Sequence, residues 1–74
     1  MDLNKQRRFI FTKEYKTDKG SIPEGSQLDE FRGMYYFNGG LCDTYSTGLF
    51  EYMLNNHKLR QEYLTEVKII ENKV

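Results

Sequence analysis

The dipeptide Asn38-Gly39 is the feature that most constrains how this chain can fold. It stands between two apolar runs, Met34–Phe37 and Leu41–Cys42. A two-residue hairpin turn needs a positive φ at both central residues, and Asn followed by Gly accepts this most readily. The pattern therefore predicts an antiparallel hairpin whose register is set by its turn.

The residues before this hairpin alternate and are punctuated by glycine. We expect a first strand with Phe9 and Phe11 on its core side, because large apolar residues recur there at a spacing of two. The Lys16–Gly20 and Ser21–Gly25 segments favour turns, since each contains turn residues and ends on a glycine. The strands that this pattern predicts cover Arg8–Tyr15 and Ser26–Arg32.

The residues after the hairpin change to helical spacing. Asp43 or Thr44 can cap a helix by accepting from a free backbone N–H, and Asn55-Asn56 ends it. Gly48 weakens this helix by about 1 kcal/mol relative to Ala, and a close approach to the sheet would explain its presence. The chain then continues with a second short helix and a final strand, expected over His57–Tyr63 and Leu64–Ile70.

The length and the cysteine count limit the architecture to one domain with no covalent or metal support. A chain of 74 residues has room for one core, so residues 1–74 form a single domain whose ends, 1–6 and 72–74, we expect to be frayed. Cys42 is the only cysteine, which excludes an internal disulfide. His57 is the only histidine, too few ligands for a structural zinc site. We expect no metal and no cofactor.

The order of these segments indicates an α+β fold. Five short strands, a long first connection, a tight turn between the third and fourth strands and one or two short helices before the last strand suggest a small five-stranded antiparallel SH3-like barrel. The turn segments Lys19–Ser26, Phe31–Gly33 and Tyr36–Gly40 resemble those of small uncharacterised proteins encoded by tailed bacteriophages, a resemblance that extends over residues 9–74. It implies a phage accessory protein and carries no catalytic residues with it.

No segment of the sequence indicates export or a membrane. The Phe9–Phe11 run is too short for the core of a signal peptide, and no window approaches the roughly 20 apolar residues of a membrane span. The unpaired Cys42 fits a reducing compartment. We therefore expect a cytoplasmic protein, in the host cytoplasm if it is phage-encoded, with no membrane partner.

The aromatic residues are the best candidates for a functional surface. Six Tyr and five Phe among 74 residues is a high content. Side chains alternate along a strand, so Tyr35 and Phe37 share one face and Tyr36 takes the other. At least one of these faces lies near the surface unless the helices cover it, and exposed rings there would form a protein-binding patch. The proposed site residues are Tyr35, Tyr36 and Phe37, with Asp29 and Glu30 as an acidic rim.

The charge distribution leaves a second interpretation open. Residues 1–20 carry a net charge of +3, whereas residues 21–54 carry −4. A basic arm can contact phosphates, and small barrels can stack bases on aromatic rings. The zero net charge of the chain opposes this, since nucleic-acid affinity needs a concentrated basic footprint. The residues that such a nucleic-acid interface would use are Arg7, Arg8, Lys13 and Lys16.

Nothing in the sequence has the form of a catalytic site. Cys42 is more easily read as a small buried hydrophobe than as a nucleophile, and His57 as a residue at a helix end. Asp29 and Glu30 are adjacent in a strand and would point to opposite faces, which disfavours paired acid–base chemistry. The leading hypothesis is a non-enzymatic module that binds and modulates a host or phage protein. A nucleic-acid-binding barrel and a self-associating particle protein are the alternatives.

Overall fold

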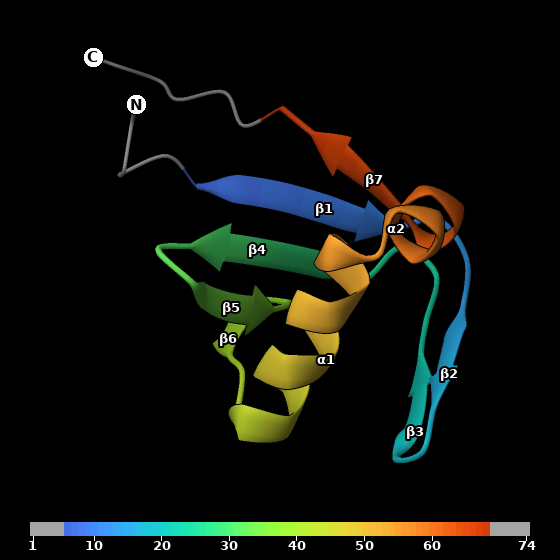
Figure 1. The fold of residues 1–74 in the computed structure, drawn as a ribbon, viewed down its shortest axis with the longest axis horizontal. Helices are drawn as coiled ribbons and strands as arrows, with labels where there is room; N and C mark the ends of the chain where they lie inside the picture. The colour runs from blue at the N-terminus through green and yellow to red at the C-terminus, as the bar shows by residue number, and fades with distance from the viewer. Residues whose placement is uncertain (1–5, 69–74) are drawn as a thin grey trace.

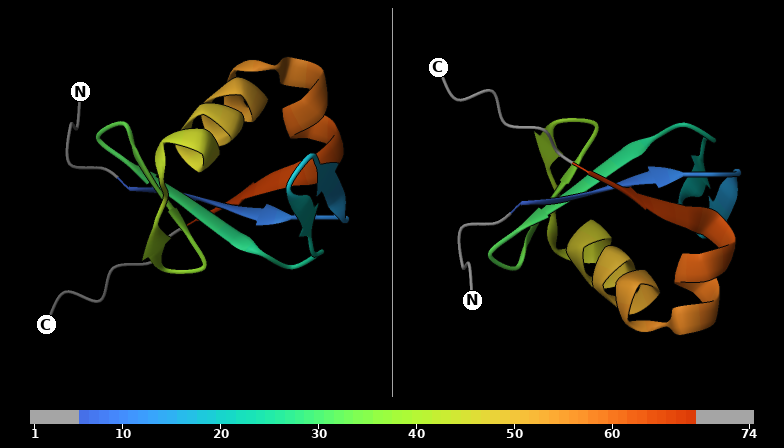
Figure 2. Two further views of the ribbon diagram at one scale, coloured as in Figure 1. Left: turned by 90° about the horizontal axis from the view of Figure 1, so that it is seen from below. Right: turned by 90° about the horizontal axis from the view of Figure 1, so that it is seen from above.

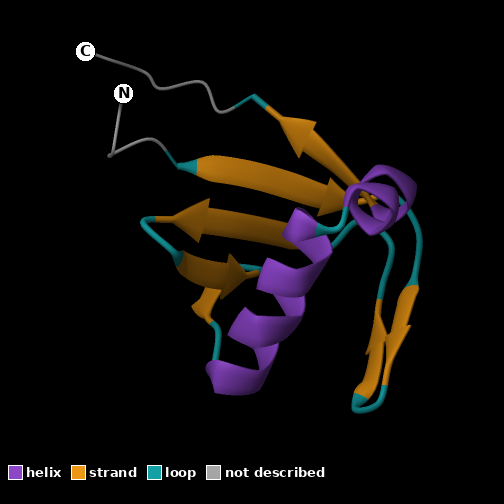
Figure 3. Ribbon diagram, viewed as in Figure 1, coloured by secondary structure: helices purple, strands orange, loops and turns teal. Residues whose placement is uncertain are grey.

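The computed structural model describes residues 6–68, and these form a small α+β fold with one five-stranded antiparallel sheet and two helices (Figures 1 and 3). The sheet has the strand order β6-β5-β4-β1-β7. The expected fraying at 1–5 and 72–74 and the expected end of the last strand at Ile69 and Ile70 lie outside the described residues. The sheet strands are β1 (Arg7–Phe11), β4 (Gln27–Phe31), β5 (Met34–Phe37), β6 (Gly40–Leu41) and β7 (Leu64–Val67).

The hairpin predicted from Asn38-Gly39 is confirmed. Asn38 and Gly39 have φ values of 48° and 90°, the left-handed geometry that this turn requires. Phe37 pairs with Gly40, and Tyr36 pairs with Leu41. The connection from β4 to β5 turns in the same way at Arg32-Gly33 (φ 54° and 80°). Both turns keep β4, β5 and β6 in a continuous meander.

The expected first strand, Arg8–Tyr15, is wrong in its second half. β1 ends at Phe11, because its partner strand β7 begins only at Leu64, where α2 (His57–Tyr63) ends. The N–H of Thr12 still bonds to the carbonyl of Tyr63, in register with the Phe11–Leu64 pair, before the chain leaves the sheet. The residues expected to form only turns instead build a separate two-stranded hairpin, β2 (Tyr15–Thr17) with β3 (Gly20–Ile22). Tyr15 joins this hairpin and packs edge-on against Tyr63, with ring centroids 4.9 Å apart.

The two helices, α1 (Thr44–Asn55) and α2 (His57–Tyr63), follow the predicted pattern. Asp43 caps α1 by accepting from the backbone N–H of Ser46 at 2.8 Å. Asn56 ends α1 and caps α2 by accepting from the N–H of Leu59 at 3.2 Å. The expected packing reason for Gly48 is wrong, because a Cβ added there would meet no atom within 4 Å.

The core lies between the sheet and the helices. Both helices lie on one side of the sheet, and among residues 6–68 no helix covers its other side (Figure 2). Phe9 and Phe11, the core positions predicted for the first strand, are each 1% exposed. The remaining buried apolar residues are Leu28, Tyr35, Phe50, Met53 and Leu64. The sheet therefore has a covered inner face and an outer face that the helices leave open. Neither helix in the described part of the chain has the length and apolar character needed to cross a membrane.

Candidate functional site

The alternation of the three consecutive aromatic residues divides them between the two faces of the sheet. Tyr35 lies on the inner face and is only 8% exposed. Phe37 lies on the same face and stacks on Phe50 of α1, with ring centroids 5.7 Å apart. Helix α1 therefore covers both rings, and neither provides the open patch expected of them. Tyr36 alone of the three lies on the outer face.

Tyr36 lies within a group of apolar residues on the outer face. Leu41 is its cross-strand partner on β6, and Met34 precedes it by two positions on β5. Phe31 is the partner of Met34 on β4. Paired residues of antiparallel strands point to the same side of the sheet, so these four side chains share one face. Leu41 is 66% exposed and Met34 is 44% exposed, values that leave large apolar side chains in contact with solvent. We call this group, Phe31, Met34, Tyr36 and Leu41, the outer aromatic patch.

A shallow hollow of about 280 Å³ opens within the outer aromatic patch. It is lined by Gln6, Asp29, Phe31, Tyr36 and Gly39. The rings of Phe31 and Tyr36 border the hollow from neighbouring strands. Gly39 of the hairpin turn also borders it and has no side chain to obstruct it. A partner side chain can enter such a hollow and contact the rings from the solvent side.

Asp29, expected as an exposed acidic rim residue, is instead buried. It is 5% exposed and accepts two hydrogen bonds from the guanidinium of Arg8, at 2.9 and 3.2 Å. The side-chain amide of Gln27 donates to it as well, at 3.0 Å. These bonds satisfy the carboxylate and raise the pKa of Arg8. The base of the hollow is thus polar and internally neutralised, and Asp29 fixes Arg8 in place instead of presenting a free negative charge.

Glu30, the second expected rim residue, lies on the opposite face from Tyr36. Its cross-strand partners are Arg7 and Tyr35, both on the inner side of the sheet. Its carboxylate accepts from the backbone N–H of Gly33 at 2.9 Å and so braces the β4–β5 turn. The expected alternation of Asp29 and Glu30 is therefore present, but the two residues do not form a rim around one surface.

The basic residues proposed for a nucleic-acid interface are dispersed and mostly paired. Arg7 pairs with Glu66 at 2.9 Å, Arg8 with Asp29 at 2.9 Å, and Lys13 with Glu62 at 3.2 Å. Arg7 and Arg8 point to opposite faces of β1, since they are adjacent in a strand. Lys16 lies on β2, in the separate hairpin. These residues do not form one basic surface, and three of the four charges are already compensated.

The residues with catalytic potential do not come together. Cys42 follows β6, and burial, with a smaller effect of Asp43, raises the pKa of its thiol. A raised pKa disfavours the nucleophilic thiolate. Cys42 borders the groove beside β3, whereas His57 borders a different depression, against α2 and β7. Among residues 6–68, no three His, Cys, Asp or Glu side chains gather as metal ligands would.

Phe31, Met34 and Leu41 were not expected from the sequence to belong to the surface around Tyr36. The signal was available at Leu41, because a two-residue turn at Asn38-Gly39 places it opposite Tyr36. Predicting that Phe31 and Met34 lie opposite each other requires knowledge of the second turn, at Arg32-Gly33, where the bulky Arg32 has a positive φ. An arginine in that conformation is uncommon, so the pattern does not predict it.

No family model matches the chain, and no curated protein or solved structure is significantly similar to it.

Proposed function

We propose that this protein is a non-enzymatic protein-binding module that uses the outer aromatic patch to bind and modulate a partner protein. The observation that supports this best is the uncovered face of the sheet, where Met34 is 44% and Leu41 is 66% exposed beside Tyr36 and Phe31. Contiguous exposed apolar side chains on a small domain mark an interaction surface. The location is a revision of the one expected from sequence. Tyr36 remains in the proposed binding surface, whereas Tyr35, Phe37 and Glu30 lie on the other face of the sheet and Asp29 is buried beneath the hollow.

The chemistry of the patch suits a protein partner. The centres of protein interfaces are poor in charge and rich in Tyr, Phe and Met, which are the residue types at this face. The ring of Tyr36 offers an apolar body with a polar tip, so it tolerates solvent before binding and contributes contact area afterwards. The one charged pair beneath the hollow, Arg8 with Asp29, is already satisfied within the chain. A partner therefore does not have to supply a counter-charge there.

We further propose that the fold is an SH3-like small barrel. The pairing of the first sheet strand, β1, with the last, β7, supports this, as do the long connection from β1 to β4 and the two tight turns that follow it. The turn segments that resemble tailed-phage proteins support an accessory role in the host cytoplasm. The proposed partner is accordingly a host or phage protein.

Affinity measurement with variants of the patch tests this function. The partner is identified by capture from bacterial lysate and mass spectrometry, and its recombinant form is titrated with the wild-type chain by calorimetry. We expect Tyr36→Ser to raise the Kd about thirtyfold, because losing a central aromatic contact costs about 2 kcal/mol.

The matched control is Tyr52→Ser, since Tyr52 is 58% exposed but lies on α1, away from the patch. Its Kd should stay at the wild-type value. Equal affinities for wild type and Tyr36→Ser would refute the proposed surface. A salt-dependent gel shift with DNA or RNA, in the absence of any protein partner, would favour the nucleic-acid alternative instead.

A further inference from the structure

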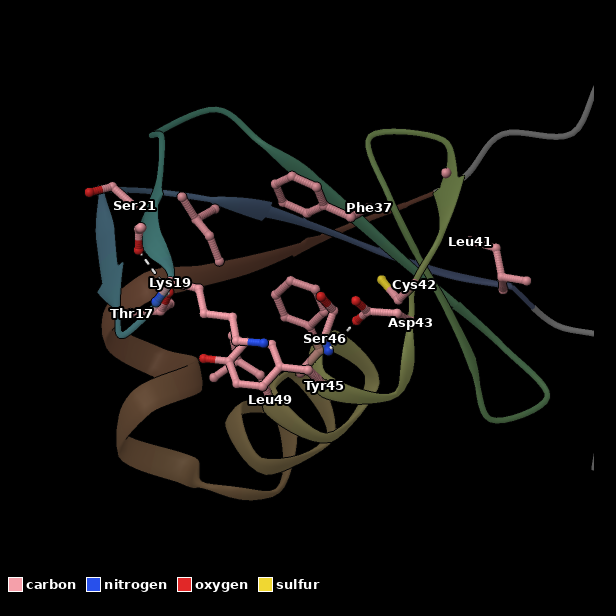
Figure 4. Close-up of a pocket in the computed structure, with 14 residues that line it drawn as sticks. Thr17, Lys19, Ser21, Phe37, Leu41, Cys42, Asp43, Tyr45, Ser46 and Leu49 are labelled. Carbon is pink, nitrogen blue, oxygen red and sulfur yellow. Dashed lines mark hydrogen bonds between the residues drawn. The ribbon is translucent and has the colours of Figure 1, made fainter.

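A second surface of the molecule is a groove between the β2–β3 hairpin and α1. Its volume is about 490 Å³. Figure 4 shows residues of the hairpin on one side of it, the end of β6 on the other, and residues of α1 below. All of Gly20–Ile22 line the first side and Gly40–Cys42 line the second. The glycines contribute backbone atoms only, so part of each wall is main chain.

Both walls are edge strands. Within residues 6–68, β6 is the last strand of its sheet, and β3 pairs only with β2. The N–H of Cys42 bonds to the carbonyl of Tyr35 at 2.9 Å. Hydrogen-bonded and non-hydrogen-bonded pairs alternate in an antiparallel ladder, so the N–H and C=O of Leu41 point away from β5. Such an edge is a template on which an extended chain can pair.

The floor of the groove is apolar. Phe37 and Phe50 stack there, and Leu49 and Ile22 pack beside them. A bulky apolar side chain can rest on Phe37, which is half-buried, whereas Phe50 stacks beneath it and is only 2% exposed.

A single ammonium group stands at the mouth of the groove. The Nζ atom of Lys19, on the hairpin turn, lies 4.3 Å from the centroid of the Tyr45 ring on α1. Within the described chain, Lys19 has no carboxylate as an ion-pair partner. Asp43 also lines the groove and interacts electrostatically with Lys19, which contributes to its lowered pKa, while its carboxylate accepts from the N–H of Ser46 as the helix cap. Lys19 therefore differs from Arg7, Arg8 and Lys13, because it forms no ion pair within the described residues; a ligand carboxylate can contact it, although Asp43 offsets part of the attraction.

We propose that this groove binds an extended acidic peptide segment of a partner protein. The peptide main chain pairs with the free edge of β6 at Leu41, one bulky apolar side chain rests on Phe37 above the buried ring of Phe50, and a carboxylate pairs with Lys19. This inference rests on the proposed protein-binding function. Leu41 belongs to both surfaces, through its side chain on the outer face and its main chain at the groove, whereas Tyr36 belongs only to the outer aromatic patch and Lys19 only to the groove. Substitutions at the two surfaces therefore separate the two proposals.

An NMR titration of the full-length ¹⁵N-labelled chain tests the groove. The probe is a synthetic decapeptide that alternates Glu with Leu and Phe, and a matched peptide carries Lys at each Glu position. We expect the acidic peptide to shift the amide signals of Gly20–Ile22 and Gly40–Cys42 and to slow hydrogen exchange at Leu41. The basic peptide should bind at least about tenfold more weakly.

Two charge reversals on the same hairpin distinguish a specific contact from a general effect of charge. Lys19→Glu should weaken the acidic peptide about tenfold, because an attraction becomes a repulsion. Lys16→Glu makes the same change of charge at an exposed position that does not line the groove, and it should leave the Kd within about twofold.

Three results would overturn the groove proposal: no saturable shift at millimolar peptide, equal effects of the two reversals, or shifts confined to Phe31, Met34 and Tyr36. The last result would leave the outer aromatic patch as the binding surface. Loss of partner binding in Tyr36→Ser with intact peptide binding would likewise show that the two surfaces act separately.

Discussion

The opposite placement of two neighbouring tyrosines predicts very different costs of removing them. Tyr35→Ala deletes a ring that is 8% exposed and packed in the core, which destabilises by about 3 kcal/mol. Tyr36→Ala deletes a partly exposed ring on the outer face, and we expect about 1 kcal/mol or less. A domain of this size has roughly 4–11 kcal/mol of stability in total, so the first change removes a large part of it.

Urea unfolding followed by far-ultraviolet circular dichroism measures both variants. The midpoint should fall steeply for Tyr35→Ala and little for Tyr36→Ala, with unchanged slopes. In thermal unfolding, the melting temperature should fall by roughly 12–24 °C for Tyr35→Ala and by less than about 8 °C for Tyr36→Ala. Equal losses in the two variants would mean that both rings are core, and the outer aromatic patch would no longer be a free surface.

Other local features give further predictions. Gly48→Ala should raise the unfolding free energy by up to about 1 kcal/mol, since the position is exposed in a helix and a Cβ there meets no atom; an unchanged or lower urea midpoint would contradict this. Gly39→Ala should cost about 1–2 kcal/mol by the same assay, because its φ is 90°. Asn56→Ala should cost about 1 kcal/mol through loss of the α2 cap, visible as reduced helix content. The bond from the N–H of Ser46 lowers the pKa of Asp43 in the folded state; its contribution to stability is therefore present above the ordinary carboxyl pKa and is lost as the pH falls through the lowered one. Asp43→Asn keeps a cap and should remove this part of the acid dependence measured by urea unfolding.

Features set by neighbouring residues could be predicted from the sequence. The Asn38-Gly39 turn and the helix caps at Asp43 and Asn56 each depend on a few consecutive residues and on their φ preferences. The alternation of Tyr35 and Tyr36 follows from the same local geometry. These predictions are confirmed by the structure because no distant contact competes with them.

Features set by distant residues could not be predicted. β1 ends at Phe11 because its partner strand β7 begins only at Leu64, where α2 ends, and both elements are far away in the chain. The burial of Asp29 depends on the register that places Arg8 beside it. A carboxylate in a strand is expected at the surface unless a buried partner for it is known. The prediction that Asp29 forms an exposed acidic rim was wrong for this reason.

The side of the sheet that the helices cover also depends on distant contacts. The sequence shows that Tyr36 opposes Tyr35 and Phe37, but both sides carry aromatic rings. Phe50 and Met53 pack in the core against the side of Tyr35 and Phe37, and this packing determines which side of the sheet is covered. The ion pairs of Arg7 and Lys13 depend on the same tertiary arrangement.

Site-specific photocrosslinking tests the outer aromatic patch most directly. Tyr36 is replaced by p-benzoylphenylalanine in one variant and Tyr52 in another, and each is irradiated in cells that contain the partner. We predict that the probe at Tyr36 captures one defined protein and that the probe at Tyr52 does not capture it. Equal capture from both positions, or capture only from Tyr52 on α1, would contradict binding through the open face of the sheet.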